Sequence, residues 1–200
     1  MKRDAAKFQY YLITDHYQYR QPLHEAAQQA ELHRVAYYQL REKDMDKRAL
    51  LDVAKHIRPA LEQTKFVVNG HLDVALACQA DGLHLQAGNI PVAVVRKNFP
   101  HLLIGYSAHS SEEILEAESA GADYVLVSPV FPPLSKKGNL PPLGIEKLKE
   151  WAAAVRIPVF ALGGITAGNL HKIAETGCYG AAGITLFLSN GQFSASGMVI

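Results

Sequence analysis

The sequence lacks several features that mark whole classes of protein. It has only two cysteines in 200 residues, Cys78 and Cys178, which lie far apart and form no CxxC motif. This spacing predicts neither a disulfide framework nor a cysteine-based zinc site. No apolar run reaches the roughly 20 residues that a membrane-spanning helix needs. We therefore expect reduced core cysteines in a cytoplasmic protein that has no membrane partner.

The charge pattern and the loops lack two further signals. The net charge is +1 and the basic residues are scattered, whereas a nucleic-acid-binding surface needs a cluster of them. No GxGxxG loop follows the first apolar stretch, where a dinucleotide-binding domain would carry it. The first apolar stretch follows the basic segment MKRDAAKF, as in a signal peptide, but no cleavage site with small residues comes after it. We therefore interpret it as a strand and not as a signal peptide. We expect one domain over residues 1–200 and no nucleic-acid partner.

Short apolar runs rich in Val, Ile and Tyr alternate with helical patterns along the whole chain. One such pattern, SSEEILEAESAG, opens with serine and early acidic residues and ends at Gly121, and another, TAGNLHKIAETG, begins at Thr166. The predicted strands are Tyr10–Thr14, Ala36–Arg41, Phe66–Val68, Gly82–Leu85, Leu102–Ser107, Tyr124–Val130, Val159–Leu162 and Ala181–Leu186.

Eight strands that alternate with helices in 200 residues predict a compact (β/α)₈ TIM barrel of the α/β class. After the eighth strand only SNGQFSASGMVI remains, which is polar and rich in Gly and Ser. The eighth helix is therefore expected to be short, irregular or missing. Such an end would expose part of the barrel wall and favour a homo-oligomer.

Polar residues follow the predicted strands, at the end of the barrel where sites of this fold lie. The period-2 alternation of QLREK places Gln39, Arg41 and Lys43 on one side of the second strand. An inward arginine needs an anion, which is either a ligand or a carboxylate such as Asp15 or Glu42. Substrate-binding candidates at other strand ends and loops are Asn69, Ser107 and Lys137, the last in the loop FPPLSKKGNLPPLG.

Two further groups have specific chemistry. Gly163 and Gly164 stand between a strand and a helical pattern, where backbone N–H groups can approach a phosphate, and Thr185, near the end of the eighth predicted strand, can add a hydroxyl or its own N–H. A tight turn that requires glycine is the alternative interpretation of the glycine pair. Of the nine histidines, His84 and His109 follow strands and are the candidates for proton transfer near neutral pH.

Taken together, these motifs resemble the thiamine phosphate synthase/TenI superfamily. The stretches are YYLITD, QLREK, VVNGHLDVALACQADGLHL, IGYSAHSSEEILEAESAGADYVLVSPVFPPLSKKG, PPLGIEKL and PVFALGGITAGNL, in the order of that family from Tyr10 to Phe187. The resemblance implies the barrel fold and a phosphorylated thiazole as the small-molecule ligand.

The resemblance also shows where this sequence departs from the synthase branch. A synthase joins a pyrimidine diphosphate to a thiazole phosphate with Mg²⁺, which two aspartates hold. Those positions correspond here to Gly70 and to Asn89 or a neighbour, and neither is a carboxylate. Because Mg²⁺ prefers charged oxygen ligands, the departure argues against ordinary synthase activity and predicts no metal site and no cofactor.

VVNGHLDVAL looks more like the TenI branch, which includes a metal-independent isomerase, the thiazole tautomerase, that aromatises a carboxythiazole phosphate in thiamine biosynthesis. His71 stands where that branch has arginine, and Pro129 stands where the tautomerase has its proposed acid/base histidine. The tautomerase interpretation therefore assigns proton transfer to His109 or His84. Its alternatives are a non-catalytic thiazole-phosphate-binding protein and a synthase with a degenerate Mg²⁺ site.

Overall fold

A computed structural model describes residues 8–132 and 141–198 of the chain. In this part of the chain, eight parallel strands alternate with seven α-helices. The strands are β1 (Gln9–Ile13), β2 (Tyr37–Leu40), β3 (Lys65–Asn69), β4 (Gly82–Leu85), β5 (Leu103–Ala108), β6 (Tyr124–Val127), β7 (Val159–Ala161) and β8 (Gly180–Gly183). The helices are α1 (Leu23–Leu32), α2 (Lys47–Ile57), α3 (Leu72–Ala77), α4 (Val92–Asn98), α5 (Ser111–Ser119), α6 (Ile145–Ala154) and α7 (Leu170–Ala174).

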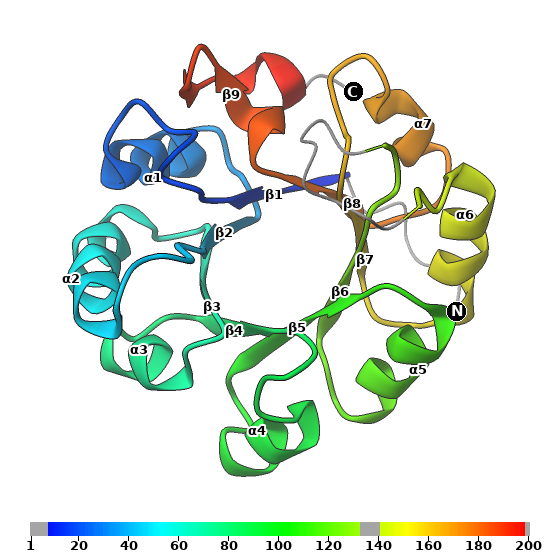
Figure 1. Cartoon of the computed structure of the whole chain (residues 1–200), viewed down its shortest axis with the longest axis horizontal. Helices are drawn as coiled ribbons and strands as arrows, with labels where there is room; N and C mark the ends of the chain where they lie inside the picture. Colours follow the sequence, from blue (N-terminus) through cyan, green and yellow to red (C-terminus); the bar gives the residue numbers. More distant parts are fainter. Residues whose placement is uncertain (1–7, 133–140, 199–200) are drawn as a thin grey trace.

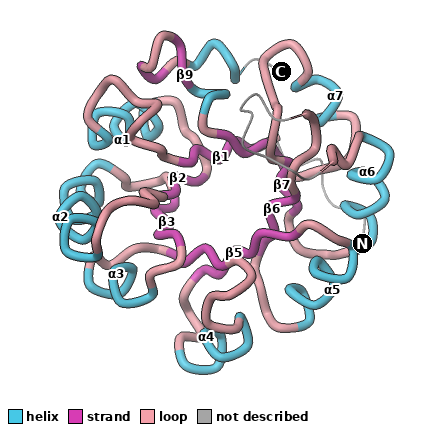
Figure 2. The backbone as a smooth tube through the Cα atoms, viewed as in Figure 1, coloured by secondary structure: helices cyan, strands magenta, loops and turns pink. Residues whose placement is uncertain are grey.

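The strands form a closed barrel in which each strand pairs with its neighbours in sequence and β8 pairs with β1. Figure 1 shows the strands as an inner ring, with the helices arranged around it. In Figure 2 the same two layers are separated by colour. The predicted (β/α)₈ barrel is confirmed.

Local sequence signals account for several helix ends. The side chain of Ser110 accepts a hydrogen bond from the N–H of Glu113 at the start of α5, as its sequence predicts, and Asp46 caps α2 in the same way. The prediction that Thr166 caps the next helix is wrong, because α7 begins at Leu170 and its N-cap is Asn169. The N–H of Thr166 donates to Oδ1 of Asn169, so residues 166–169 form a side-chain-closed turn before the helix.

The period-2 alternation of the strands divides the core into two parts. Inside the barrel, one cluster of buried residues contains Tyr11, Ile13, Tyr124, Leu126, Phe160 and Ala182. The intervening residues, such as Leu12 and Val125, pack against the helices in a larger outer cluster. Because the interior is filled by aromatic rings, the barrel is a packed core, and ligand chemistry is confined to its ends.

The chain after β8 contains no α-helix among the residues described up to Met198. It forms a 3₁₀ turn (Thr185–Phe187), a two-stranded antiparallel sheet of β9 (Leu188–Ser189) and β10 (Gln192–Phe193), and a second 3₁₀ turn (Ala195–Met198). Of the three outcomes that the sequence left open, a short, an irregular or a missing eighth helix, the described residues show the last: no α-helix follows β8. Tyr10 Oη donates to the carbonyl of Met198 at 2.5 Å, which fixes this end against β1.

Two predicted strands extend well past the observed strand ends. β6 ends at Val127 and not at Val130, because the chain turns at Ser128 and Pro129, and a proline has no N–H to extend the parallel ladder. β8 ends at Gly183 and not at Leu186, since Ile184 already has helical backbone angles. Both cysteines are free and buried, as predicted. Among the described residues, no helix is long and apolar enough to cross a lipid bilayer.

Candidate functional site at the barrel mouth

A chain of buried polar groups crosses the barrel below its C-terminal mouth. Nε2 of Gln39 donates to Oη of Tyr11 at 3.1 Å, and the hydroxyls of Tyr11 and Tyr124 lie 2.8 Å apart. Burial raises the pKa of Tyr11 and of Tyr124 well above that of an exposed tyrosine, so both remain neutral. This network fixes the Gln39 amide, and the sequence had not indicated the two tyrosines that form it.

His84 lies in the same interior layer and is 2% exposed. Its Nε2 is 2.8 Å from Oγ of Ser107 on β5, and its ring stacks on Tyr124 with a centroid distance of 5.9 Å. Burial, and secondarily the charge of Arg41, lower the pKa of His84 to about 3. The expectation that His84 titrates near neutral pH is therefore corrected: its imidazole is neutral and serves as a hydrogen-bonding group.

Nδ1 of His84 is buried and has no hydrogen-bond partner among the described residues. Asn69 is its direct neighbour in the β3–β4 pairing. A buried polar atom without a partner costs free energy, which a ligand hydrogen bond at this position would offset. Three predicted residues, Asn69, His84 and Ser107, are thus brought together at one part of the mouth.

Arg41 follows β2 and is half-buried. Burial lowers the pKa of its guanidinium, while Asp15 and then Glu42 act in the opposite direction. No ion pair joins Arg41 to another residue within the described part of the chain. The described acids therefore act on Arg41 through their charge and not through an ion pair.

Glu42 is occupied by other partners. Its carboxylate accepts hydrogen bonds from the Thr14 hydroxyl and from the backbone N–H of His16, and Nδ1 of His16 lies 2.6 Å from Oε2. Lys43, the next residue, is exposed, so the predicted side of β2 retains Gln39 and Arg41 but not Lys43 as inward groups. Lys137 lies outside the described residues.

The two positions expected to carry metal-binding acids in a synthase lie together in space. Gly70 has φ of +71°, and a Cβ atom at this position would be 3.6 Å from Nδ2 of Asn89. Oδ1 of Asn89 accepts from the N–H of Gln86. No group of three or more His, Cys, Asp or Glu side chains suited to a metal occurs among residues 8–132 and 141–198. A glycine and an engaged amide do not match the charged oxygen ligands that Mg²⁺ prefers.

His109 lies outside this interior layer and is exposed. Its Nδ1 is 2.7 Å from the carbonyl of Ser128, which accepts only, so Nδ1 carries the proton. It lines a cavity of about 270 Å³ together with Pro129, Leu143, Lys147 and Trp151, between α5 and α6. The structure therefore separates the two predicted histidines: His84 faces the barrel interior and His109 faces an outer cavity.

The strands β6 to β8 contribute mainly backbone to the mouth. A Cβ atom at Gly163 would lie 2.9 Å from Pro129, and one at Gly164 would lie 2.4 Å from the carbonyl oxygen of Pro132. Close packing and positive φ values of +95° and +64° thus require both glycines. Neither N–H donates to the backbone of another described residue. Thr185 is exposed in a 3₁₀ turn and not at a strand end, which corrects its predicted position.

Comparison with known proteins agrees with this architecture. The family model described as thiamine monophosphate synthase matches residues 10–187. The "Putative thiamine-phosphate synthase 2" of Aquifex aeolicus is 39% identical over 180 residues, which cover 89% of this chain and 96% of that protein. The thiamine-phosphate synthase of Desulfitobacterium hafniense strain Y51 is 40% identical over 158 residues, covering 78% and 76% of the two chains.

A solved structure of thiamine phosphate pyrophosphorylase from Pyrococcus furiosus superposes with a TM-score of 0.81 at 34% identity. The match covers 94% of this chain and 89% of that one. Since the family model and the relatives cover most of the chain, this protein belongs to the thiamine monophosphate synthase family.

Proposed function

We propose that the barrel mouth binds a thiazole phosphate and that the protein is a transferase, which joins the thiazole nitrogen to the methylene carbon of a pyrimidine diphosphate and releases diphosphate. The names of the relatives favour this reaction over the tautomerase that the sequence alone suggested. The proposal rests on the half-buried Arg41, which forms no ion pair with a described acid. Its charge acts on the neutral His84, whose ring is hydrogen-bonded to Ser107.

In this proposal, each group has a defined part. The guanidinium of Arg41 attracts the charge of the diphosphate, while the fixed amide of Gln39 and the side chain of Asn69 orient the heterocycles. The N–H groups of Gly163 and Gly164 hold the thiazole phosphate. Because Gly70 and Asn89 replace the acids of a Mg²⁺ site, we expect turnover to be slow and only weakly dependent on Mg²⁺.

The test restores the missing carboxylates. The site has room for Gly70→Asp, since the nearest atom to its Cβ is 3.6 Å away, and aspartate tolerates positive φ at a cost of about 1 kcal/mol. We expect the Gly70→Asp/Asn89→Asp variant to form thiamine phosphate faster than the wild type, and only when Mg²⁺ is present. The single variant Gly70→Asn, which keeps Asn89, is the control, because asparagine at both positions has the size of aspartate without its charge.

A second candidate is the tautomerase. It is favoured by the uncharged residues Gly70 and Asn89, because aromatisation of a carboxythiazole phosphate needs no metal. Incubation with the unaromatised substrate and measurement of the ultraviolet absorbance of the product separates the two reactions. Rapid aromatisation by the wild type, with no thiamine phosphate from either the wild type or the acidic double variant, would replace the transferase by the tautomerase. Tight thiazole phosphate binding with neither product would indicate a non-catalytic binding protein.

A further inference from the structure

The proposed reaction does not use the buried carboxylate of Glu42, which is nonetheless the most enclosed acid at the mouth. Its side chain is 1% exposed. A buried carboxylate is costly unless several donors surround it. Here the donors come from one place, the end of β1 and the loop after it: the Thr14 hydroxyl, the His16 N–H and the His16 ring. Glu42 therefore joins the end of β2 to the end of β1.

The same contacts include the backbone of Arg41. The Thr14 hydroxyl, which donates to Glu42, also accepts a hydrogen bond from the N–H of Arg41 at 3.0 Å. Thr14 is fully buried, so water does not compete for these bonds. The Thr14 side chain, directly after β1, thus holds residue 41 by its main chain and residue 42 by its carboxylate. Both residues lie beyond Leu40, the last residue of β2.

Strand alternation explains why this arrangement leaves the guanidinium free. The side chains of residues 41 and 42 point to opposite sides of the strand direction. Glu42 is therefore directed to its partners after β1, while Arg41 faces the barrel interior near His84. The Thr14 hydroxyl and His16 occupy the two oxygens of the Glu42 carboxylate. No ion pair between Glu42 and Arg41 forms among the described residues. The acid that could have neutralised Arg41 is therefore engaged elsewhere.

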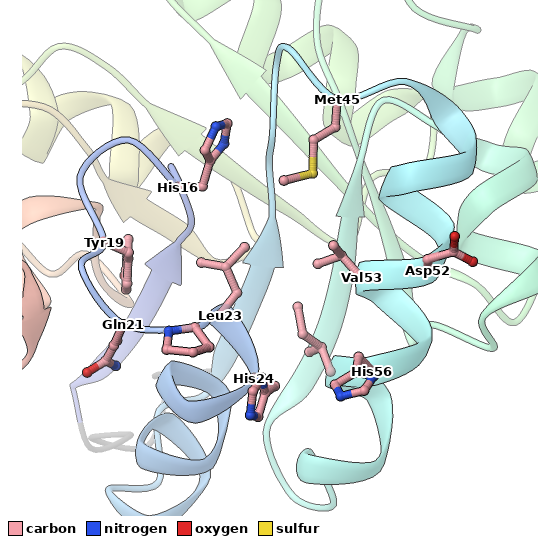
Figure 3. A pocket seen from close by; sticks show the side chains of 11 residues that line it. His16, Tyr19, Gln21, Leu23, His24, Met45, Asp52, Val53 and His56 are labelled. Carbon is pink, nitrogen blue, oxygen red and sulfur yellow. The ribbon is translucent and has the colours of Figure 1, made fainter.

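His16 depends on Glu42 for its position more than on packing. Figure 3 shows it on the loop after β1, at the edge of a cavity of about 430 Å³ that the apolar side chains of Leu23, Met45 and Val53 also line. His16 is one-third exposed, and its other ring contact is the exposed Tyr17. A ring beside a cavity has few neighbours to restrain it, so the bond to Glu42 is its main restraint.

We propose that Thr14, Glu42 and His16 form a clamp that positions Arg41 for an anion, and that these three are positioning residues of the site. The proposal rests on the proposed function in one respect, namely that Arg41 binds the anionic part of the substrate. It adds that the affinity for this anion is set by side chains which do not touch it. Preorganisation of this kind raises affinity by lowering the entropy lost on binding.

The chain offers a matched pair of threonines for the test. Thr14 and Thr176 are both buried, and each hydroxyl donates to one acceptor and accepts from one backbone N–H. Only Thr14 belongs to the clamp. With inorganic pyrophosphate as the probe in calorimetry, we expect Arg41→Ala to weaken binding about 10- to 100-fold. Thr14→Val is expected to weaken it about fivefold, and Thr176→Val to leave it unchanged.

A second pair of variants separates geometry from charge. Gln at position 42 can accept from His16 through its oxygen and donate to the Thr14 hydroxyl through its amide, which reverses the Thr14 bond but keeps residue 42 joined to both partners, whereas Glu42→Ala removes these contacts. We expect Glu42→Gln to bind pyrophosphate within about twofold of the wild type and Glu42→Ala to bind as weakly as Thr14→Val. In the Arg41→Ala background, Thr14→Val should have no further effect.

The histidines give an independent comparison, because His16 and His56 line the same cavity but only His16 contacts Glu42. His16→Ala is expected to weaken pyrophosphate binding, and His56→Ala is not. Hydrogen exchange of the Arg41 amide shows whether Thr14→Val has released residue 41. Wild-type affinity in Thr14→Val despite faster exchange at Arg41, or equal losses in the two threonine variants, would overturn the clamp.

Failure of the proposed function gives a different result. If Arg41→Ala binds pyrophosphate as well as the wild type, Arg41 is not the anion-binding residue, and both the proposed function and the clamp built on it are excluded. If Arg41→Ala weakens binding while Glu42→Ala does not, the anion site remains and only the clamp is excluded.

Discussion

The two halves of the barrel mouth are built from different chemical groups. From β2 to β5 the mouth presents side chains, among them Arg41, His84 and Ser107, each fixed by hydrogen bonds or burial. From β6 to β8 it presents the backbone of Gly163 and Gly164, packed against Pro129 and the residues after it. Substitutions can change the side chains of the first half while the fold is kept. The closely packed glycine backbone of the second half cannot change without disturbing its contacts. The first half is therefore suited to specificity and the second to a constant group such as phosphate.

The largest effect is expected from a substitution in the β6–β8 half of the mouth, which is built from backbone. Gly164→Ala forces a Cβ atom to within 2.4 Å of the Pro132 carbonyl oxygen at a φ of +64°. Overpacking and backbone strain together should lower the free energy of unfolding by about 3 kcal/mol. Urea denaturation followed by circular dichroism measures this loss. Gly88→Ala, whose added Cβ meets no atom within 4 Å, is the control for the cost of positive φ alone.

An intermediate effect concerns the side-chain half and appears in the pH dependence of stability. The pKa of His84, lowered to about 3, lies below that of an unfolded histidine near 6.5, so between these values the unfolded chain binds the extra proton. Stability should therefore rise with pH across this window and fall as the pH drops toward 3, by at most about 1.4 kcal/mol per pH unit from this group.

The measurement is urea denaturation between pH 4 and pH 7, comparing the wild type with His84→Gln. We expect the slope of unfolding free energy against pH to be smaller in the variant. His109→Gln, which removes an exposed imidazole, is the control for the loss of a histidine as such. Equal slopes in the wild type and His84→Gln would show that His84 is not buried in its neutral form.

The smallest expected effect lies at the boundary between the two halves. His109 is exposed, and its Nδ1 is engaged by the Ser128 carbonyl. If the mouth is the site of the transferase reaction, His109→Ala should change its rate by no more than about twofold. Loss of the reaction in this variant would instead return His109 to the catalytic role that the sequence suggested.

Strand periodicity accounts for how well the sequence placed the candidate residues around the barrel mouth. Gln39 and Arg41 lie on the expected side of β2, and Asn69, His84 and Ser107 lie on neighbouring strands, because alternation and strand order alone place them there. Thr185 was misplaced because a glycine-rich strand and a following 3₁₀ turn have similar apolar patterns. No local signal indicated that His109 faces away from the interior.

The sequence by itself determined the fold, because the hydrophobic alternation of eight strands is a local property, and it indicated the family through motifs that follow one another along the chain. Only the tertiary structure decided the state of each polar group. Burial beside Tyr124 makes His84 neutral. The hydrogen-bond donors Thr14 and His16, which follow β1, direct Glu42 away from Arg41. Such effects arise from residues that are distant in sequence, and the desolvation and hydrogen bonding that cause them exist only once the barrel has closed.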